Sequence, residues 1–187
     1  MSETQLLVAS ARNGDRDAMA DLCYRHQGRL FALIRARMPS SLSQRIAAED
    51  FLQETLLEAT RKIGAFEDQG PSSFYRWLVG IARYKLAEAE RAQRAIKRTK
   101  EDTLHDAVES KDTSLSGRVV RREKAQFVHE ALGNLPDRQA EAIRLRYLEG
   151  LNVAETADRL DCSVSAAKSL VTRALAELGT RISTDSH

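Results

Sequence analysis

The sequence predicts an all-α protein made of two small helical domains joined by a flexible linker. The chain of 187 residues contains only 3 prolines and 9 glycines, which favours helices over sheets. Apolar residues recur at three- and four-residue spacing along most of it, as on the buried face of a helix. This periodicity fails between residues 95 and 122. We therefore expect domains over 1–95 and 123–187, with 96–122 as the linker.

The first predicted domain begins with two helical stretches. Gly14 and Asp15 interrupt the first of them, and the Asp15 side chain is expected to cap the second. The second stretch ends at Met38, because the residue before a proline disfavours the helical conformation. Ser40 to Ser43 are then expected to form a polar connection.

Two more helices follow in this domain. The third is expected from about Ile46 to Ile63, with an apolar side formed by Leu52, Leu56, Ala59 and Ile63. Ser72 or Ser73 can cap the fourth helix. The apolar stripe of the fourth helix consists of Phe74, Trp77, Leu78, Ile81 and Ala82.

The second predicted domain has clear helix boundaries. Pro136 fits the first turn of a helix, and Gly150 fits a helix end. Asn152 is expected to cap a short helix over 153–160, and Ser163 a final, longer one. The inner side of the final helix is expected to consist of Ala167, Leu170, Val171, Ala174, Leu175 and Leu178.

These last two helices have the spacing of a helix-turn-helix. Asp161 to Ser163 form the turn, and the small residues Ala154 and Ala157 would let the helices approach closely. The second helix of such a unit enters the major groove of DNA, where hydroxyls and cations contact bases and phosphates. The outward residues here are Ser165, Ala166, Lys168, Ser169, Thr172 and Arg173. An ordinary helical packing unit is the alternative.

Basic charge is concentrated in the middle of the chain. Residues 75–100 hold eight basic and two acidic side chains, a net charge of +6, whereas 123–187 carry −2. Aromatic rings interleaved with cations can stack on unpaired bases while the cations follow the backbone. Phe74 and Trp77 share the apolar stripe and are expected in the core, whereas Tyr75 and Tyr84 are expected to be exposed. A solvated helix face is the alternative.

An acidic and polar set lies on the third predicted helix. Spacing of three and four places Asp50, Gln53 and Glu54 along one helix face. Carboxylates repel phosphate, so this face suits a protein partner with basic residues better than it suits DNA. A plain solvated face is again the alternative.

No catalytic, metal or cofactor site is expected. The four histidines are scattered, and Cys23 and Cys162 lie far apart without the spacing of metal ligands. Each cysteine sits among apolar positions and is expected to pack as a small hydrophobe. No apolar run approaches the length of a membrane span, and no signal peptide is recognisable. We therefore expect a cytoplasmic protein with reduced thiols.

Four segments in order resemble the extracytoplasmic-function sigma factors of bacterial RNA polymerase, within the sigma-70 family. Glu49–Thr55 is similar to the family's polymerase-clamp-binding motif D-L-x-Q-E-x-F. Phe74–Arg83 is similar to its F-x-x-W-L-x-x-I-A-R signature. Leu135–Gln139 and Arg144–Leu151 resemble the opening of its C-terminal domain, and Val164–Leu178 resembles its recognition helix.

The resemblance implies a function without catalysis. Asp50, Gln53 and Glu54 would bind core RNA polymerase, and the final helix would read the minus-thirty-five element as duplex. The fourth helix and the loop 66–73 would capture the non-template strand of the minus-ten element. The residues implied in that capture are Tyr75, Arg76, Arg83, Tyr84, Lys85 and Arg91. Many family members are held inactive by an anti-sigma factor, which makes such a partner a candidate here.

Several positions depart from the family pattern. Tyr84 stands where asparagine is common, and Glu88 where aspartate is usual. The recognition helix reads A-A-K-S-L over 166–170 instead of T-V-K-S-R. These departures predict an unusual promoter sequence rather than a loss of DNA binding.

A stand-alone transcriptional regulator that binds duplex operator DNA is the main alternative. Such a protein has no need of the Asp50, Gln53 and Glu54 face, and it would bind palindromic DNA tightly without polymerase. An enzyme is a third and weaker alternative, because no nucleophile and base set or phosphate-binding glycine loop is present.

Overall fold

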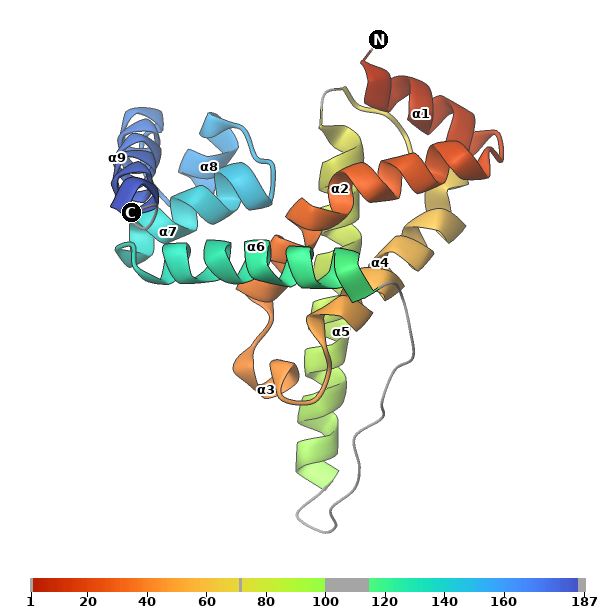
Figure 1. Cartoon of the computed structure of the whole chain (residues 1–187), viewed down its shortest axis with the longest axis horizontal. Coiled ribbons are helices and arrows are strands. Elements are labelled where there is room, and N and C mark those ends of the chain that lie inside the picture. The colour runs from red at the N-terminus through yellow and green to blue at the C-terminus, as the bar shows by residue number, and fades with distance from the viewer. Residues whose placement is uncertain (1, 71, 100–114, 185–187) are drawn as a thin grey trace. The chain divides into compact units, whose positions relative to one another are not determined.

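The computed structural model describes residues 2–70, 72–99 and 115–184. Over these ranges every regular element is a helix (Figure 1), which confirms the predicted all-α class. The chain divides into two compact units, Met1–Arg121 and Arg122–His187.

Part of the predicted linker is helical. Helix α5 (Ser73–Thr99) continues into the range 96–122, and helix α6 (Leu115–Gly133) begins inside it. Arginine and lysine, frequent at both ends of this range, are good helix formers even where no apolar stripe is present. Residues 100–114 of the predicted linker lie outside the described residues.

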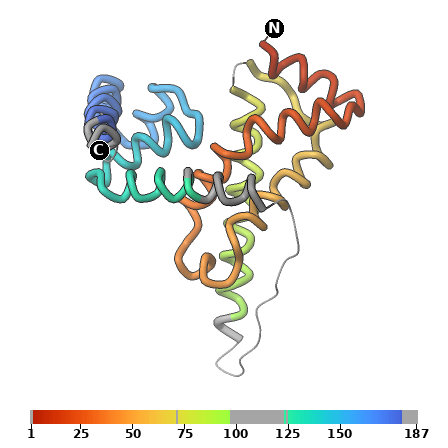
Figure 2. Tube along the Cα trace, in the orientation of Figure 1, coloured from red at the N-terminus to blue at the C-terminus, as the bar shows by residue number. Residues whose placement is uncertain are grey.

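The first unit is built from α1, α2, α4 and α5, together with two short turns. Figure 2 follows the chain through the hairpin of α1 and α2 and on to α5. The elements before α5 are α1 (Glu3–Arg12), α2 (Arg16–Arg37), α3 (Ser40–Ser43), α4 (Ala48–Lys62) and the 3-10 turn η1 (Ile63–Ala65).

Local signals set the ends of α2 and α3. Asp15 accepts hydrogen bonds from the amides of Asp17 at 3.0 Å and Ala18 at 3.1 Å, as its predicted capping role requires. Met38 ends α2 in an extended conformation. Ser40 to Ser43 form a helical turn rather than the predicted polar connection. Pro39 precedes this turn in an extended conformation, and its carbonyl accepts from the amides of Leu42 at 2.9 Å and Ser43 at 3.0 Å.

The two serines predicted as capping candidates lie at the start of α5. Ser73 is the first helical residue, and its hydroxyl donates to Asp68 at 2.6 Å. Ser72 precedes the helix in the left-handed region, with φ at +66°, and its carbonyl accepts from the amide of Arg76 at 3.0 Å.

The core of the first unit lies between α2, α4 and α5. The predicted apolar stripes face inward, and the residues there with exposures of 4% or less include Leu22, Leu30, Phe31, Leu33, Ile34, Leu42, Leu52, Ala59, Phe74, Leu78 and Ala82.

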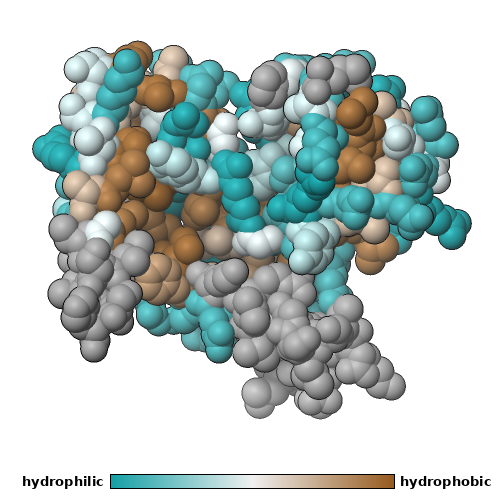
Figure 3. All heavy atoms as spheres, turned by 45° about the horizontal axis from the view of Figure 1, so that its top comes forward, coloured by the Kyte–Doolittle hydropathy of each residue, from teal (hydrophilic) through white to brown (hydrophobic). Residues whose placement is uncertain are grey.

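Hydrophilic residues cover much of the face shown in Figure 3, with hydrophobic residues reaching the surface in patches between them.

The second unit contains the predicted pair of short and long helices. Pro136 directly precedes the helix that it was predicted to begin, and Gly150 has a φ of +80° after the last turn. Asn152 and Glu155 form a capping box, and the Ser163 hydroxyl accepts from the amide of Ala166 at 3.1 Å. After α6 the elements are α7 (Asp137–Ile143), the π-helical turn η2 (Arg144–Leu148), α8 (Val153–Arg159) and α9 (Val164–Thr184).

Small residues line the contact between α8 and α9. Ala157 is 1% exposed and Ala167 and Ala174 are fully buried, so the two helices can pack closely. Ala154 is exposed, so of the two small residues predicted at this contact only Ala157 lies in it. Leu175 was predicted to face inward and is 44% exposed, because it lies 100° around the helix from Ala174.

Candidate functional site

The acidic and polar face predicted on α4 is present on its surface. Asp50 and Gln53 are half-buried, and the Glu54 side chain is 63% exposed. Ala47 provides no side-chain cap at the start of α4, where Glu49 and Asp50 occupy the first turn. The positive end of the helix dipole stabilises the negative charges of these two side chains.

Leu57 extends this face by one turn and was missed by the sequence reasoning. Its position three residues after Glu54 and four after Gln53 places it beside their side chains, one turn further along α4. It is 55% exposed, although large apolar residues at such positions usually pack inside. The signal was present in the sequence, because Leu57 falls outside the apolar stripe of Leu52, Leu56, Ala59 and Ile63.

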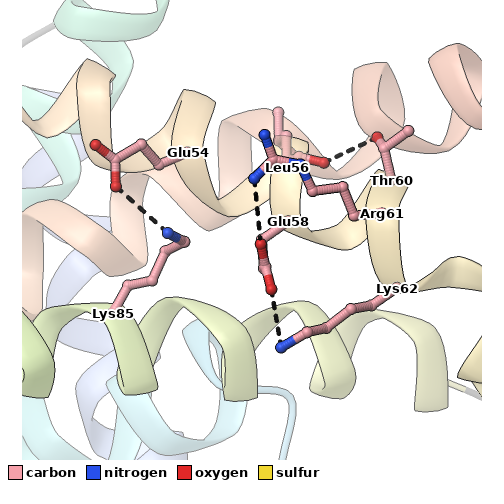
Figure 4. A network of polar contacts seen from close by, with 7 residues as sticks. All are labelled: Glu54, Leu56, Glu58, Thr60, Arg61, Lys62 and Lys85. Atoms are coloured by element: carbon pink, nitrogen blue, oxygen red, sulfur yellow. Dashed lines mark hydrogen bonds and ion pairs between the residues drawn. The ribbon is translucent and has the colours of Figure 1, made fainter.

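An ion pair joins the α4 face to α5. Lys85 Nζ lies 3.4 Å from a Glu54 carboxylate oxygen, and the Lys85 side chain is only 20% exposed (Figure 4). One turn further along α4, Glu58 pairs with Lys62 at 2.8 Å and Arg61 at 3.7 Å. The hydrogen bond between Glu58 and Lys62 lowers the pKa of the carboxyl and raises the pKa of the amine.

Tyr75 is buried, contrary to the prediction that it is exposed. It is 1% exposed, its ring centroid lies 5.6 Å from that of His26, and the Arg29 guanidinium stands 3.9 Å from the ring centroid. The first turn of α5 lies against α2, which covers the ring. Tyr75 therefore cannot stack on a base in this conformation.

Of the remaining α5 residues, Arg76, Arg83, Tyr84 and Arg91 lie within about 100° of one another around the helix. Lys85 lies on the opposite side, toward α4. Arg83 and Arg91 are exposed, Tyr84 is 61% exposed, and Arg76 and Lys85 are half-buried. An exposed ring beside arginines has the composition of a platform for single-stranded nucleic acid.

The loop 66–73 before α5 is tied to the body of the unit. Phe66 is 3% exposed, and its ring lies 5.6 Å from Phe74 and 5.1 Å from Trp77. The predicted core position of Phe74 is confirmed, and Trp77 is half-buried. Asp68 within the loop accepts hydrogen bonds from three donors: the side chains of Gln5 and Ser73 and the amide of Gly70.

The first turns of α9 present the predicted outward residues. Ser165, Lys168, Ser169, Thr172 and Arg173 are exposed, and Ala166 is half-buried. The Ser169 hydroxyl donates to the Ser165 carbonyl at 3.0 Å. Arg173 Nε donates to the Ser169 carbonyl at 3.2 Å, which holds the guanidinium along the helix.

Within the described residues, no three His, Cys, Asp or Glu side chains lie together in a group that could hold a metal ion. Cys23 and Cys162 carry free, half-buried thiols, and burial raises the pKa of Cys23. Among the described residues no helix has the length and apolar character of a membrane span.

Comparisons with known proteins agree with this geometry. The family described as Sigma-70 region 2 matches residues 9–96, and Sigma-70, region 4 matches residues 127–178. The ECF RNA polymerase sigma-E factor of Haemophilus influenzae is 30% identical over 183 residues, which span 91% of this chain and 90% of that protein.

Two further relatives extend the comparison. The ECF RNA polymerase sigma factor BldN of Streptomyces coelicolor is 33% identical over 172 residues, which span 92% of this chain and 63% of that protein. The fold is similar to that of CnrH, solved in complex with the cytosolic domain of CnrY, with a TM-score of 0.50 and 23% identity. That alignment covers 98% of this chain and 99% of CnrH. The chain therefore belongs to the extracytoplasmic-function (ECF) RNA polymerase sigma factors of the sigma-70 family.

Proposed function

We propose that this sigma factor, which directs RNA polymerase to promoters as a DNA-binding initiation factor, divides that function among three surfaces. The α4 face would bind the polymerase, α5 with the loop 66–73 would hold melted minus-ten DNA, and α9 would read the minus-thirty-five duplex. The observation that carries the proposal is that each of the three surfaces presents exposed polar or charged side chains on the two matched sigma-70 regions.

The polymerase face would consist of Asp50, Gln53, Glu54 and Leu57. An exposed leucine surrounded by polar and acidic side chains has the composition of a binding hot spot with its polar rim. The carboxylates would pair with basic residues of the polymerase. We place this interaction in the cytoplasm, where the polymerase acts.

The minus-ten surface would consist of Arg76, Arg83, Tyr84, Lys85 and Arg91. Tyr84 would stack on an unpaired base, and the cations would contact the phosphates of the same strand. Tyr75 is omitted because its ring is buried under Arg29.

The minus-thirty-five surface would lie on the first three turns of α9. Lys168 and the hydroxyls of Ser165, Ser169 and Thr172 can donate hydrogen bonds to base edges in the major groove. Arg173, which directly follows Thr172, would contact a phosphate.

An anti-sigma factor would be the second protein partner. CnrH, whose fold is similar, was solved in complex with the cytosolic domain of CnrY. We propose that a protein of this kind covers the polymerase-binding and DNA-binding surfaces here. The stand-alone regulator is not favoured, because the chain matches both sigma-70 regions.

Co-elution with bacterial core RNA polymerase tests the proposal. The wild type is expected to co-elute, and the Asp50→Ala/Gln53→Ala/Glu54→Ala variant is expected to lose most of its affinity while keeping its helical circular dichroism. The Lys168→Ala variant is the matched control and should co-elute, because it changes only the duplex-reading surface. Full affinity of the triple variant would show that another face binds the polymerase.

A further inference from the structure

Asp68 organises the loop that precedes α5. Its Oδ1 accepts hydrogen bonds from the Gly70 amide at 3.0 Å and the Ser73 hydroxyl at 2.6 Å. Its Oδ2 accepts from Gln5 Nε2 at 2.9 Å, across 63 residues of sequence. One carboxylate thus links the loop to the first turn of α5 and to α1. These hydrogen bonds lower the pKa of Asp68, so the group is charged at neutral pH.

Gln5 is itself held in place. Its Oε1 accepts from the Ser2 amide at 2.7 Å, and its own amide donates to the Ser2 hydroxyl at 3.3 Å, which forms the capping box of α1. Glu3 forms an ion pair with Arg25, which fixes the first turn of α1 to α2. Gln5 therefore offers its Nε2 donor to the loop from a fixed position.

The loop backbone needs such support. Gly70 has a φ of +102° and Ser72 a φ of +66°. A serine rarely adopts the left-handed region unless the surrounding contacts hold it there. Phe66 anchors the beginning of the loop in the aromatic cluster with Phe74 and Trp77. Asp68 is the polar anchor between these two ends.

We propose that Gln5 and Asp68 form a clasp that sets the loop conformation before DNA arrives, and that both are positioning residues for the capture of an unpaired minus-ten base. This inference rests on the proposed function of the loop. Extruding a base from a duplex costs unstacking energy that protein contacts must offset. Loop residues 66–70, 72 and 73 that are already held in place lose less conformational entropy on binding, so more of their contact energy remains for this step.

The two side chains allow a test by exchange of donor and acceptor. Gln5→Glu keeps the oxygen that caps α1 but places a carboxylate against Asp68. Asp68→Asn keeps an oxygen for Gly70 and Ser73 but turns an amide donor toward the donor of Gln5. Combining the two changes restores one donor and one acceptor across the same gap. A clasp therefore predicts that each single variant is defective and that the double variant recovers.

The experiment uses the full chain assembled with bacterial core polymerase. The probe is a duplex that the wild-type holoenzyme selects from random DNA by run-off transcription, with 2-aminopurine in its minus-ten region to report melting. Each single variant is expected to melt this duplex about three- to tenfold less, the range that one lost hydrogen bond supports. The double variant should return to within about twofold of the wild type, a recovery typical of directly coupled residues.

Ser43→Ala is the matched control. It removes an exposed serine hydroxyl that donates to the Ser40 carbonyl, away from the clasp, so it should melt the duplex as the wild type does. Unfolding temperature and co-elution with core polymerase are measured for every variant. Asp68 is exposed and Gln5 is half-buried at the surface, so both quantities should change little in the single variants.

Three outcomes would overturn the inference. Normal melting by both single variants would show that the clasp does not matter for DNA capture. A double variant no better than the single variants would show that the two residues are not coupled. A melting defect that follows a lowered unfolding temperature would assign the pair to fold stability. If the wild-type holoenzyme selects no duplex at all, the proposed function itself fails, which is a separate result.

Discussion

Glu54 on α4 and Lys85 on α5 form an ion pair of 3.4 Å between the proposed polymerase face and the proposed minus-ten surface. Glu54 is 63% exposed, whereas Lys85 is 20% exposed. In the free protein the ammonium group of Lys85 is therefore held by a carboxylate that the polymerase would contact. Binding of the polymerase to Glu54 would release Lys85 toward DNA phosphates.

Glu54→Gln should strengthen binding of the isolated protein to single-stranded DNA. Release of Lys85 for one phosphate contact steepens the slope of log affinity against log salt concentration by about 0.7. Fluorescence anisotropy with a labelled oligonucleotide at several salt concentrations measures this slope.

Glu58→Gln is the matched control for that measurement. It removes the same charge from the same helix but breaks the pairs with Arg61 and Lys62, while Lys85 interacts with Glu58 only through its charge, without an ion pair. Equal slopes for the two variants would mean that only net charge matters, and the coupling between Glu54 and Lys85 would be rejected.

Leu57→Ala should weaken binding to core polymerase. Truncation of an apolar residue at the centre of an interface costs about 1–2 kcal/mol, or about 5- to 30-fold in affinity. The unfolding temperature should change little, because the side chain is 55% exposed. Leu6 on α1 is also 55% exposed, so Leu6→Ala serves as the control. This variant should bind the polymerase with unchanged affinity. Equal affinities of the two variants would exclude Leu57 from the interface.

Lys168→Ala and Arg173→Ala should impair promoter recognition in different ways. Loss of the base-edge contact from Lys168 should cost about 1–3 kcal/mol at one base pair and relax the preference there. Loss of a phosphate contact from Arg173 should weaken all duplexes alike and reduce the salt slope by about 0.9. Holoenzyme binding to matched and singly substituted duplexes distinguishes the two effects. Loss of polymerase co-elution in either variant would indicate misfolding instead.

His26 should make the first unit sensitive to acid. Burial, followed by the charges of Arg29 and Arg25, lowers the pKa of His26 from its ordinary value of 6.5. The unfolded chain therefore binds more protons than the folded chain between these two pKa values. Stability due to neutral His26 is present above pH 6.5 and is lost as the pH falls toward the lowered pKa.

His26→Leu should reduce that loss. In the wild type, the His26 ring nitrogen Nε2 is buried without a hydrogen-bond partner among the described residues. An apolar replacement therefore leaves no polar group unpaired. Urea unfolding at pH 7.5 and pH 5.5 should show a smaller drop in the free energy of unfolding for the variant than for the wild type. Equal drops would mean that other groups account for the acid sensitivity.

Much of the architecture was predictable because it depends on neighbours in sequence. The capping roles of Asp15, Asn152 and Ser163 involve amides two or three residues away, so a single segment contains all the information. The outward residues of α9 were predictable for the same reason, since helical periodicity alone orients them. The local rule failed at Leu175, which lies at the edge of its apolar stripe.

Tertiary structure decided which side chains meet across helices. Periodicity could not separate Tyr75 from Tyr84, because the burial of Tyr75 depends on Arg29 and His26 of α2. The pairing of Gln5 with Asp68 spans 63 residues. Such contacts form when packing of the apolar faces brings distant segments together, and no local pattern specifies them. The sequence alone therefore determined the helices, the family and the candidate surfaces, while packing decided which of their residues remain accessible and which are coupled.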